Sequence, residues 1–138
     1  MTLALDTNVF VELLRKRRAT VQRRFNDALA AEEPLVASLV VLHELRFGCL
    51  LHHNPTAELA RVRVALAEVD IEPLNQRDVV AAASIRAALR RRGRAVGALD
   101  GLIAGQALAR DWTLVTANRR EFDRIEGLNV IDWTVAAD

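Results

Sequence analysis

Cysteine is nearly absent from this 138-residue sequence, and its scarcity excludes two ways of holding a small protein together. The single cysteine, Cys49, has no partner for an intrachain disulfide and cannot form a metal site built from several thiolates. It lies within the apolar run 47–51, so we expect a buried structural thiol. The fold must therefore depend on a hydrophobic core, and a chain of this length can bury one.

Long hydrophobic runs are absent as well. No segment approaches the roughly 18 apolar residues that a membrane-spanning helix needs. The N-terminal stretch contains Asp6 and Glu12 and has no basic leader, which is not the pattern of a signal peptide. Hydrophobic residues make up 51% of the chain and charged residues 27%, a globular composition. We expect one domain, residues 1–138, in a cytoplasmic protein without membrane contact.

Several common catalytic motifs are missing too. The sequence has no glycine-rich phosphate loop, and neither Ser38 nor Ser84 lies in the GxSxG elbow of a serine hydrolase. The HExxH pattern of zinc proteases begins at His43 but fails because position 47 is Phe47. The pair at 52–53 is typical of an exposed helix end. These absences argue against serine-nucleophile, P-loop and zinc chemistry.

Lysine is scarce, whereas arginine is abundant and clustered. Lys16 is the sole lysine, and the net charge is only +1. The basic runs are Arg15–Arg18 with Arg23 and Arg24, Arg90–Arg92 with Arg94, and Arg119 with Arg120. Guanidinium groups suit phosphate oxygens, which favours a polyanionic substrate. Solvated helix ends are the alternative for any one of these clusters.

Short apolar segments alternate with helical patterns along the whole chain. Strand-like segments are 2–5, 35–37, 69–74, 112–115 and 129–131, and helical patterns fill the intervals between them. This alternation predicts βα units and a short central parallel sheet in a three-layer α/β/α sandwich. Sites in such folds form beyond the carboxyl ends of the strands. Asp6, Ser38 and Thr116 each follow a predicted strand and are expected at that edge.

Three carboxylates interrupt otherwise apolar stretches. They are Asp6 after the first strand, Glu44 within a helix that Ser38 would cap, and Asp100 in the first turn of another helix. Carboxylates against a core are costly unless a cation meets them, and hard oxygen donors suit Mg²⁺ or Mn²⁺. Alternatively, Asp6 and Asp100 are helix N-caps and Glu44 pairs with a neighbouring helix.

The helical face that contains Glu44 helps to decide whether Glu44 is a metal ligand or the partner of an ion pair. Val40, Glu44, Phe47 and Leu51 follow one helical row, which indicates that Glu44 does not lie on a solvated face. Further along this helix, Phe47, Leu50 and Leu51 could be exposed and form a groove for a partner helix or a dimer face. Simple core packing explains the same residues.

The polar residues form an ordered set along the chain. The motifs are Leu-Asp6-Thr-Asn8, Ser38-x5-Glu44-Leu-x2-Gly48, Gly97-x2-Asp100-x2-Ile103-Ala104, Val115-Thr116-x-Asn118-x2-Glu121-Phe122, and a closing Gly127-Leu128 with Trp133. In this order and over nearly the whole chain, they resemble a PIN-domain ribonuclease. More narrowly, they resemble the VapC toxins of bacterial toxin-antitoxin pairs.

The resemblance implies a metal-dependent endoribonuclease toxin that cuts structured RNA such as transfer or ribosomal RNA. Asp6 and Asp100 match the family's principal ligands for Mg²⁺, for which Mn²⁺ substitutes, and Glu44 matches its third acid. The polar positions that orient ligands or water match Thr7, Asn8, Ser38 and Thr116. Asn118 departs from the pattern, because many PIN domains carry a fourth aspartate there; either Glu121 supplies that carboxylate or a second metal site is weak.

From the arginine clusters we expect Arg94, Arg119 and Arg120 to hold RNA phosphates beside the acidic pocket. The resemblance also implies partners. A VapB-like antitoxin would cover the pocket, and the toxin would form a homodimer.

Two other functions remain open from the residues alone. A phosphotransfer signalling module also uses an acidic Mg²⁺ pocket at a sheet edge. It would need paired acids at the first strand and a later lysine, but position 7 is Thr7 and the sole lysine is Lys16. The other alternative is a noncatalytic interaction protein whose pocket no longer binds metal.

Overall fold

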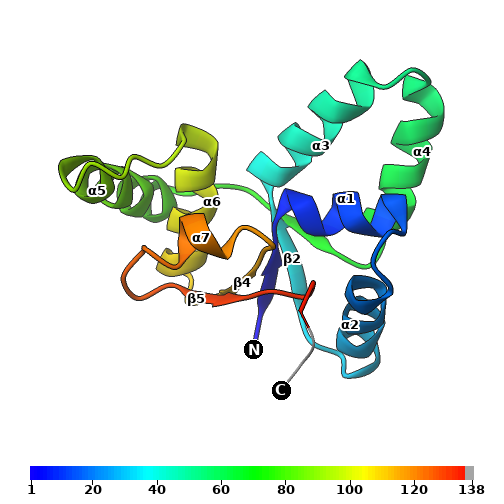
Figure 1. Cartoon of the computed structure of the whole chain (residues 1–138), viewed down its shortest axis with the longest axis horizontal. Helices are drawn as coiled ribbons and strands as arrows, with labels where there is room; N and C mark the ends of the chain where they lie inside the picture. Colours follow the sequence, from blue (N-terminus) through cyan, green and yellow to red (C-terminus); the bar gives the residue numbers. More distant parts are fainter. Residues whose placement is uncertain (136–138) are drawn as a thin grey trace.

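A five-stranded parallel sheet lies between two layers of helices in the computed structural model, which describes residues 1–135 (Figure 1). The elements in chain order are β1 (Leu3–Leu5), α1 (Thr7–Arg15), α2 (Ala19–Ala30), β2 (Leu35–Ser38), α3 (Leu39–Leu51), α4 (Pro55–Leu66), β3 (Asp70–Glu72), α5 (Gln76–Arg91), α6 (Ala98–Ala109), β4 (Thr113–Val115), α7 (Arg119–Phe122) and β5 (Asn129–Ile131). The strand order is β3-β2-β1-β4-β5, and every pairing is parallel. The predicted three-layer α/β/α sandwich is confirmed.

The connections divide the helices between the two faces of the sheet. The chain leaves β1 for β2 and β3 on one side, then returns past β1 to β4 and β5 on the other. Since parallel crossovers are right-handed, the helices before β3 cover one face and those after it cover the opposite face. Figure 1 shows this division, with α1, α2 and α4 on one side and α5 and α6 on the other. All five strands point their carboxyl ends toward the same edge.

The core lies where β1 and β4 meet the helices. Leu5, Leu114 and Val115 are almost fully buried, as continuous apolar strands in a doubly covered sheet should be. Phe10 of α1 and Phe122 of α7 pack into the same core. The expected strand at 69–74 is shorter than predicted, since β3 ends at Glu72 before Pro73, which lacks the N–H needed to extend the ladder. Cys49 is a buried free thiol, as expected.

Helices α5 and α6 pack unusually closely because a glycine lies at their contact. A Cβ atom placed on Gly105 would lie 2.5 Å from the backbone nitrogen of Ala82 and 2.6 Å from its Cα. No side chain fits at that separation. Gly101, one turn earlier, faces the aliphatic part of Arg86 in the same way. This contact fixes the position of α6, the helix that carries Asp100.

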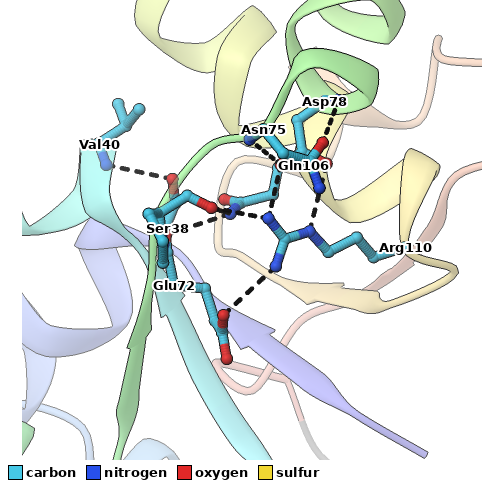
Figure 2. Close-up of polar contacts among 8 residues, drawn as sticks. Ser38, Val40, Glu72, Asn75, Asp78, Gln106 and Arg110 are labelled. Carbon is cyan, nitrogen blue, oxygen red and sulfur yellow. Dashed lines mark hydrogen bonds and ion pairs between the residues drawn. The ribbon is translucent and has the colours of Figure 1, made fainter.

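A buried ion pair joins the far end of α6 to the start of α5 (Figure 2). Asp78 is fully buried, and its Oδ2 accepts a hydrogen bond from Arg110 Nη2 at 2.7 Å. Asn75 and Asp78 form a capping box at the start of α5, and Glu72 Oε2 lies 3.3 Å from Arg110 Nη1. Burial opposes the charge of Asp78, but the bonds from Arg110 and from the Asn75 backbone outweigh it and lower the pKa of Asp78. We regard this cluster as structural.

The apolar stripe of α3 does not lie in the core beyond its first turn. Val40 is buried, but Phe47, Leu50 and Leu51 are 59%, 65% and 73% exposed. Of the two alternatives for these residues, core packing is therefore wrong, because α3 runs out past the sheet and pairs with α4 there (Figure 1). These three side chains form an exposed apolar surface. No helix among residues 1–135 is both long and apolar enough to cross a membrane.

Candidate active site

Asp6 is buried at the carboxyl end of the central strand, with only 5% of its surface exposed. It is the N-cap of α1, because its Oδ1 accepts a hydrogen bond from the backbone N–H of Thr7 at 2.8 Å. Its other oxygen, Oδ2, accepts from Thr116 Oγ1 at 2.8 Å and from Asn8 Nδ2 at 3.3 Å. The capping role predicted as an alternative is thus real, and it leaves Oδ2 facing the end of β4.

Asn8 and Thr116 connect α1 to the segment after β4. Asn8 Nδ2 also donates to Thr116 Oγ1 at 3.1 Å, and Asn8 Oδ1 accepts from the backbone N–H of Ala117 at the same distance. Thr116 is fully buried, and its hydroxyl also accepts from the Asn118 backbone N–H at 3.0 Å. These bonds fix both the Asp6 carboxylate and the start of α7.

Glu44 reaches the pocket from α3 and is held there by Thr7. The Thr7 hydroxyl donates to Glu44 Oε1 at 2.7 Å, although the two residues are 37 positions apart. The predicted alternative was an ion pair with a neighbouring helix, but Glu44 forms no salt bridge within the described residues. Its neighbours in the pocket are instead other carboxylates.

Asp100 lies in the first turn of α6 and is half-buried. The N-cap of this helix is Gly97, so the predicted alternative that Asp100 is itself the cap is wrong. Its carboxylate is free of a capping bond and still benefits from the positive end of the helix dipole. The close packing at Gly105 holds α6, and with it this turn, against α5.

The pKa values of Asp6 and Asp100 are both raised, and the charges of nearby carboxylates contribute to each shift. Burial raises the pKa of Asp6 to about 6, against lowering bonds from Thr116 and Thr7, and the charges of Asp100 and Glu44 raise it further. Burial, Glu44 and then Glu121 raise the pKa of Asp100. Asp6, Glu44, Asp100 and Glu121, from four different elements, are therefore linked by electrostatic reach at this edge, which we call the acidic pocket. A cation among them would relieve both the burial cost and the repulsion.

Ser38 lies at the same edge but acts on the backbone. It is buried at the end of β2, and its Oγ accepts from the backbone N–H of Val40 at 3.1 Å (Figure 2). Ser38 is therefore the N-cap of α3, as predicted. It contributes by fixing the start of the helix that carries Glu44.

The fourth carboxylate position has a feature that the sequence did not reveal. Asn118 is the N-cap residue of α7, but its side chain makes no capping bond. Glu121 lies one turn later, and its Oε2 is 2.5 Å from Nη2 of Arg124. The i, i+3 spacing of Glu121 and Arg124 was a visible signal for such a pair. Arg124 was nevertheless missed, since it lies outside the arginine runs.

The three predicted RNA-binding arginines lie on two segments beside the pocket, and all three are exposed. Arg119 forms an ion pair with Asp123, with 3.3 Å between Nε and Oδ2. Arg94 offers its backbone carbonyl to Arg124 Nη1 at 2.8 Å. Arg94 and Arg120 form no ion pair within residues 1–135, so their guanidinium groups are available to phosphates.

The donor set fits a hard divalent ion that keeps part of its water. Every acidic side chain of the pocket offers carboxylate oxygen, and neither histidine nor cysteine belongs to the group. In residues 1–135, no three acidic, histidine or cysteine side chains stand close enough to form a ready-made ion cage. Mg²⁺ retains several waters and is commonly bound through one or two carboxylates, so widely set carboxylates suit it. Asp6 and Asp100 are the residues that could hold it directly.

Two cavities adjoin the other side of this region. One of about 380 Å³ lies between α1, α3 and α4 and includes Thr7 and Glu44 in its wall. A larger cavity of about 690 Å³ lies between α1, α2 and α4 and is lined by side chains such as Leu13, Phe25 and Val64. None of the pocket carboxylates lines the larger cavity, so we place the chemistry at the acidic pocket.

Comparisons with known proteins agree with this geometry. The family model described as PIN domain matches residues 3–128. A relative named tRNA(fMet)-specific endonuclease VapC from Shigella flexneri is 35% identical over 130 residues, which are 94% of this chain and 96% of the relative. A relative from Rickettsia felis named Ribonuclease VapC2 is 29% identical over 133 residues, covering 96% of this chain and 98% of the relative.

Solved structures give the same result. The crystal structure of VapBC2 from Rickettsia felis bound to a DNA fragment from their promoter has a chain that matches with a TM-score of 0.90 at 28% identity, covering 96% of this chain and 99% of that one. The structure of DNA-bound VapBC from Salmonella typhimurium matches with a TM-score of 0.87 at 32% identity, covering 96% and 98%. This chain therefore belongs to the PIN domain family and, within it, to the VapC ribonucleases.

Proposed function

We propose that this chain is the toxin of a toxin-antitoxin pair and cleaves phosphodiester bonds in structured RNA with the help of Mg²⁺, for which Mn²⁺ substitutes. The observation that carries the metal-dependent chemistry is the convergence of Asp6, Glu44 and Asp100 at one edge of the sheet. The charges of neighbouring carboxylates raise the pKa of Asp6 and of Asp100, so a cation would stabilise the group, and divalent cations serve phosphodiester hydrolysis. Membership of the VapC ribonucleases supports the substrate class and replaces the phosphotransfer alternative.

In this proposal each side chain has a defined task. Asp6 and Asp100 bind the ion, and Glu44 is the third wall of the pocket, positioned by the Thr7 hydroxyl. Thr116 and Asn8 hold Asp6 Oδ2 in place. The bound ion would lower the pKa of a coordinated water and so supply the nucleophile. The chain itself therefore has to position the carboxylates and the RNA.

The arginines would orient the substrate. Arg94 and Arg120 are exposed beside the pocket, and guanidinium groups bind phosphate oxygens with two parallel bonds. Arg119 can join them when it leaves Asp123, because that exposed pair is weak. The name of the Shigella relative specifies initiator transfer RNA, and we extend transfer RNA to this chain as the first substrate to test, with ribosomal RNA as the second.

We also propose binding partners and a cellular location for this chain. The Rickettsia and Salmonella structures contain VapB with VapC, and we infer a VapB-like antitoxin that covers the acidic pocket of this chain. We also infer a homodimer, for which the exposed Phe47, Leu50 and Leu51 offer apolar surface. The chain 1–138 would act as one domain in the cytoplasm.

The experiment compares RNA cleavage by the wild-type chain and by Asp100→Asn, with total transfer RNA, Mn²⁺ and mapping of new RNA ends. We expect Asp100→Asn to lower the cleavage rate at least about 100-fold, because a ligand of the ion is lost. Asp111→Asn is the matched control, since Asp111 is exposed and precedes β4 at the opposite edge. Undiminished cleavage by Asp100→Asn would overturn the site assignment.

A second measurement separates the enzyme from a noncatalytic interaction protein. Addition of Mn²⁺ should raise the melting temperature of the wild-type chain, because an ion that binds only the folded state stabilises it by mass action. The same addition should have much less effect on Asp100→Asn. A chain whose melting temperature ignores Mn²⁺ would instead be the noncatalytic protein.

A further inference from the structure

Arg124 is the one cation that contacts an acidic residue of the pocket, among the residues described. It donates three hydrogen bonds: Nη2 to Glu121 Oε2, Nε to the Glu121 carbonyl at 3.2 Å, and Nη1 to the Arg94 carbonyl at 2.8 Å. Its side chain is 19% exposed, which is low for an arginine at the protein surface. These bonds span two segments, α7 and the loop that precedes α6.

The position of these bonds matters for the pocket. The Arg94 carbonyl lies in the loop that leads into α6, and Asp100 is in the first turn of that helix. Arg124 thus connects the segment that carries Glu121 to the segment that carries Asp100. The charge of Glu121 acts on Asp100, so the two carboxylates are within electrostatic reach of each other.

We propose that Arg124 is a positioning residue that acts as an internal counter-cation: it occupies Oε2 of Glu121 and so limits the pocket to one tightly bound divalent ion. The inference rests on the metal-dependent function proposed above. A guanidinium with two hydrogen bonds to backbone carbonyls is fixed in place and does not leave as a solvated side chain would. Its positive charge repels a second divalent ion and neutralises the carboxylate that this ion would need.

Neither Asn118 nor Glu121 then supplies a free fourth carboxylate. Asn118 offers an amide, which is a weaker ligand than a carboxylate, and Glu121 offers a carboxylate already paired with a cation. Asp6, Glu44 and Asp100 are then the acidic groups available to the ion. Glu121 would shape the pocket through its link to Arg124 rather than as an unpaired ligand.

The test is titration of the metal-free full chain with Mn²⁺, followed by electron paramagnetic resonance and calorimetry, so that binding is read without RNA cleavage. We expect one ion per wild-type chain. Arg124→Gln should bind a second ion, or bind the first about tenfold more tightly, because a positive charge is removed and a carboxylate is released. The double variant Arg124→Gln with Glu121→Gln should bind Mn²⁺ like the wild type, because the net charge of the two side chains is zero in both proteins.

Single substitution of the partner gives a second, independent readout. Glu121→Gln keeps both bonds from Arg124 to backbone carbonyls, so it should fold even if Arg124→Gln does not. We expect it to weaken Mn²⁺ binding about threefold or more, because the charge of Arg124 is then uncompensated. Arg124→Lys should keep the stoichiometry at one ion.

The possible results distinguish failure of the Arg124 role from failure of the metal-dependent function. Two ions bound with similar affinity to the wild-type chain would overturn the inference and leave the proposed function intact. The inference would also be wrong if a folded Arg124→Gln bound Mn²⁺ like the wild type, or if the double variant kept the gain. Failure of the wild-type chain to bind any Mn²⁺ would instead overturn the metal-dependent function itself.

Discussion

Replacement of the central carboxylate should stabilise the protein while abolishing its activity. Burial and the neighbouring carboxylates raise the pKa of Asp6 from 3.8 to about 6. The folded chain therefore holds a proton on Asp6 more tightly than the unfolded chain does. Above about pH 6 the charged form is present in both states, and its burial costs the fold up to about 3 kcal/mol, since each pKa unit corresponds to about 1.4 kcal/mol.

Asp6→Asn removes that charge but not the cap, because asparagine also caps helices. Two hydrogen bonds are lost, since Thr116 Oγ1 and Asn8 Nδ2 both donate to Asp6 Oδ2, and the amide NH2 of asparagine at that place cannot accept. Because each lost bond costs about 1 kcal/mol, we expect a net gain of about 1 kcal/mol at pH 7.5 without metal, or about 3–6 °C in melting temperature for a chain of this length.

The pH dependence provides the decisive check. A raised carboxyl pKa lowers stability as pH rises from 3.8 to about 6, so the advantage of Asp6→Asn should vanish near pH 4 and be complete above pH 7. The measurement is thermal unfolding in EDTA at both pH values, with Asp111→Asn as a control that should behave like the wild type. A variant less stable than the wild type at pH 7.5, or a difference that ignores pH, would refute the reasoning.

Two further predictions concern the scaffold. Asp78→Asn should cost about 3 kcal/mol in urea unfolding at pH 7, because it removes the buried carboxylate that pairs with Arg110 and leaves Arg110 with the more exposed Glu72 as its acidic partner. Because the pKa of Asp78 is lowered from 3.8, its contribution is complete above that value and is lost as pH falls through the lowered pKa. The gap between the two proteins should therefore begin to close only below about pH 4, and a gap that stays constant in more acidic solution would contradict this. Gly105→Ala should lower stability by about 1–3 kcal/mol, because its Cβ would overlap Ala82. The control is Gly48→Ala on α3, where an added Cβ would meet open space; this variant should be more stable by a few tenths to about 1 kcal/mol. If both variants changed the stability equally, the overlap with Ala82 would not be the cause.

The fold could be predicted from the sequence because its signals are local. Strand-length apolar runs, Pro34 and Pro73 at strand boundaries, and Ser38 as a cap all report on adjacent residues. Alternation of these segments is then enough to imply a parallel sheet. The strand order 3-2-1-4-5 is not encoded locally, and neither is the contact of Gly105 with α5, since both depend on which elements meet after folding.

The candidate site was predictable in part for the same reason. Asp6 and Asp100 stood out as carboxylates in apolar surroundings, and the pocket brings them together. The sequence left open whether Phe47 and Leu51 pack in the core or are exposed, because helical periodicity reports a shared face but not whether any element covers that face; the structure exposes them. Arg124 was missed because its role arises from a carbonyl 30 residues away.

The position of the site follows from the topology of the sheet. The chain moves from β1 outward through β2 and β3, then returns to the other side of β1 as β4, so the order reverses between β1 and β4. At such a reversal the connections leave in opposite directions and open a crevice at the carboxyl ends of the two strands. Asp6 follows β1 and Thr116 follows β4, and their side chains bond across this crevice at 2.8 Å. Asp6 is therefore buried at the one place where helices from both layers can bring further carboxylates toward it, which explains both the raised pKa and the pocket.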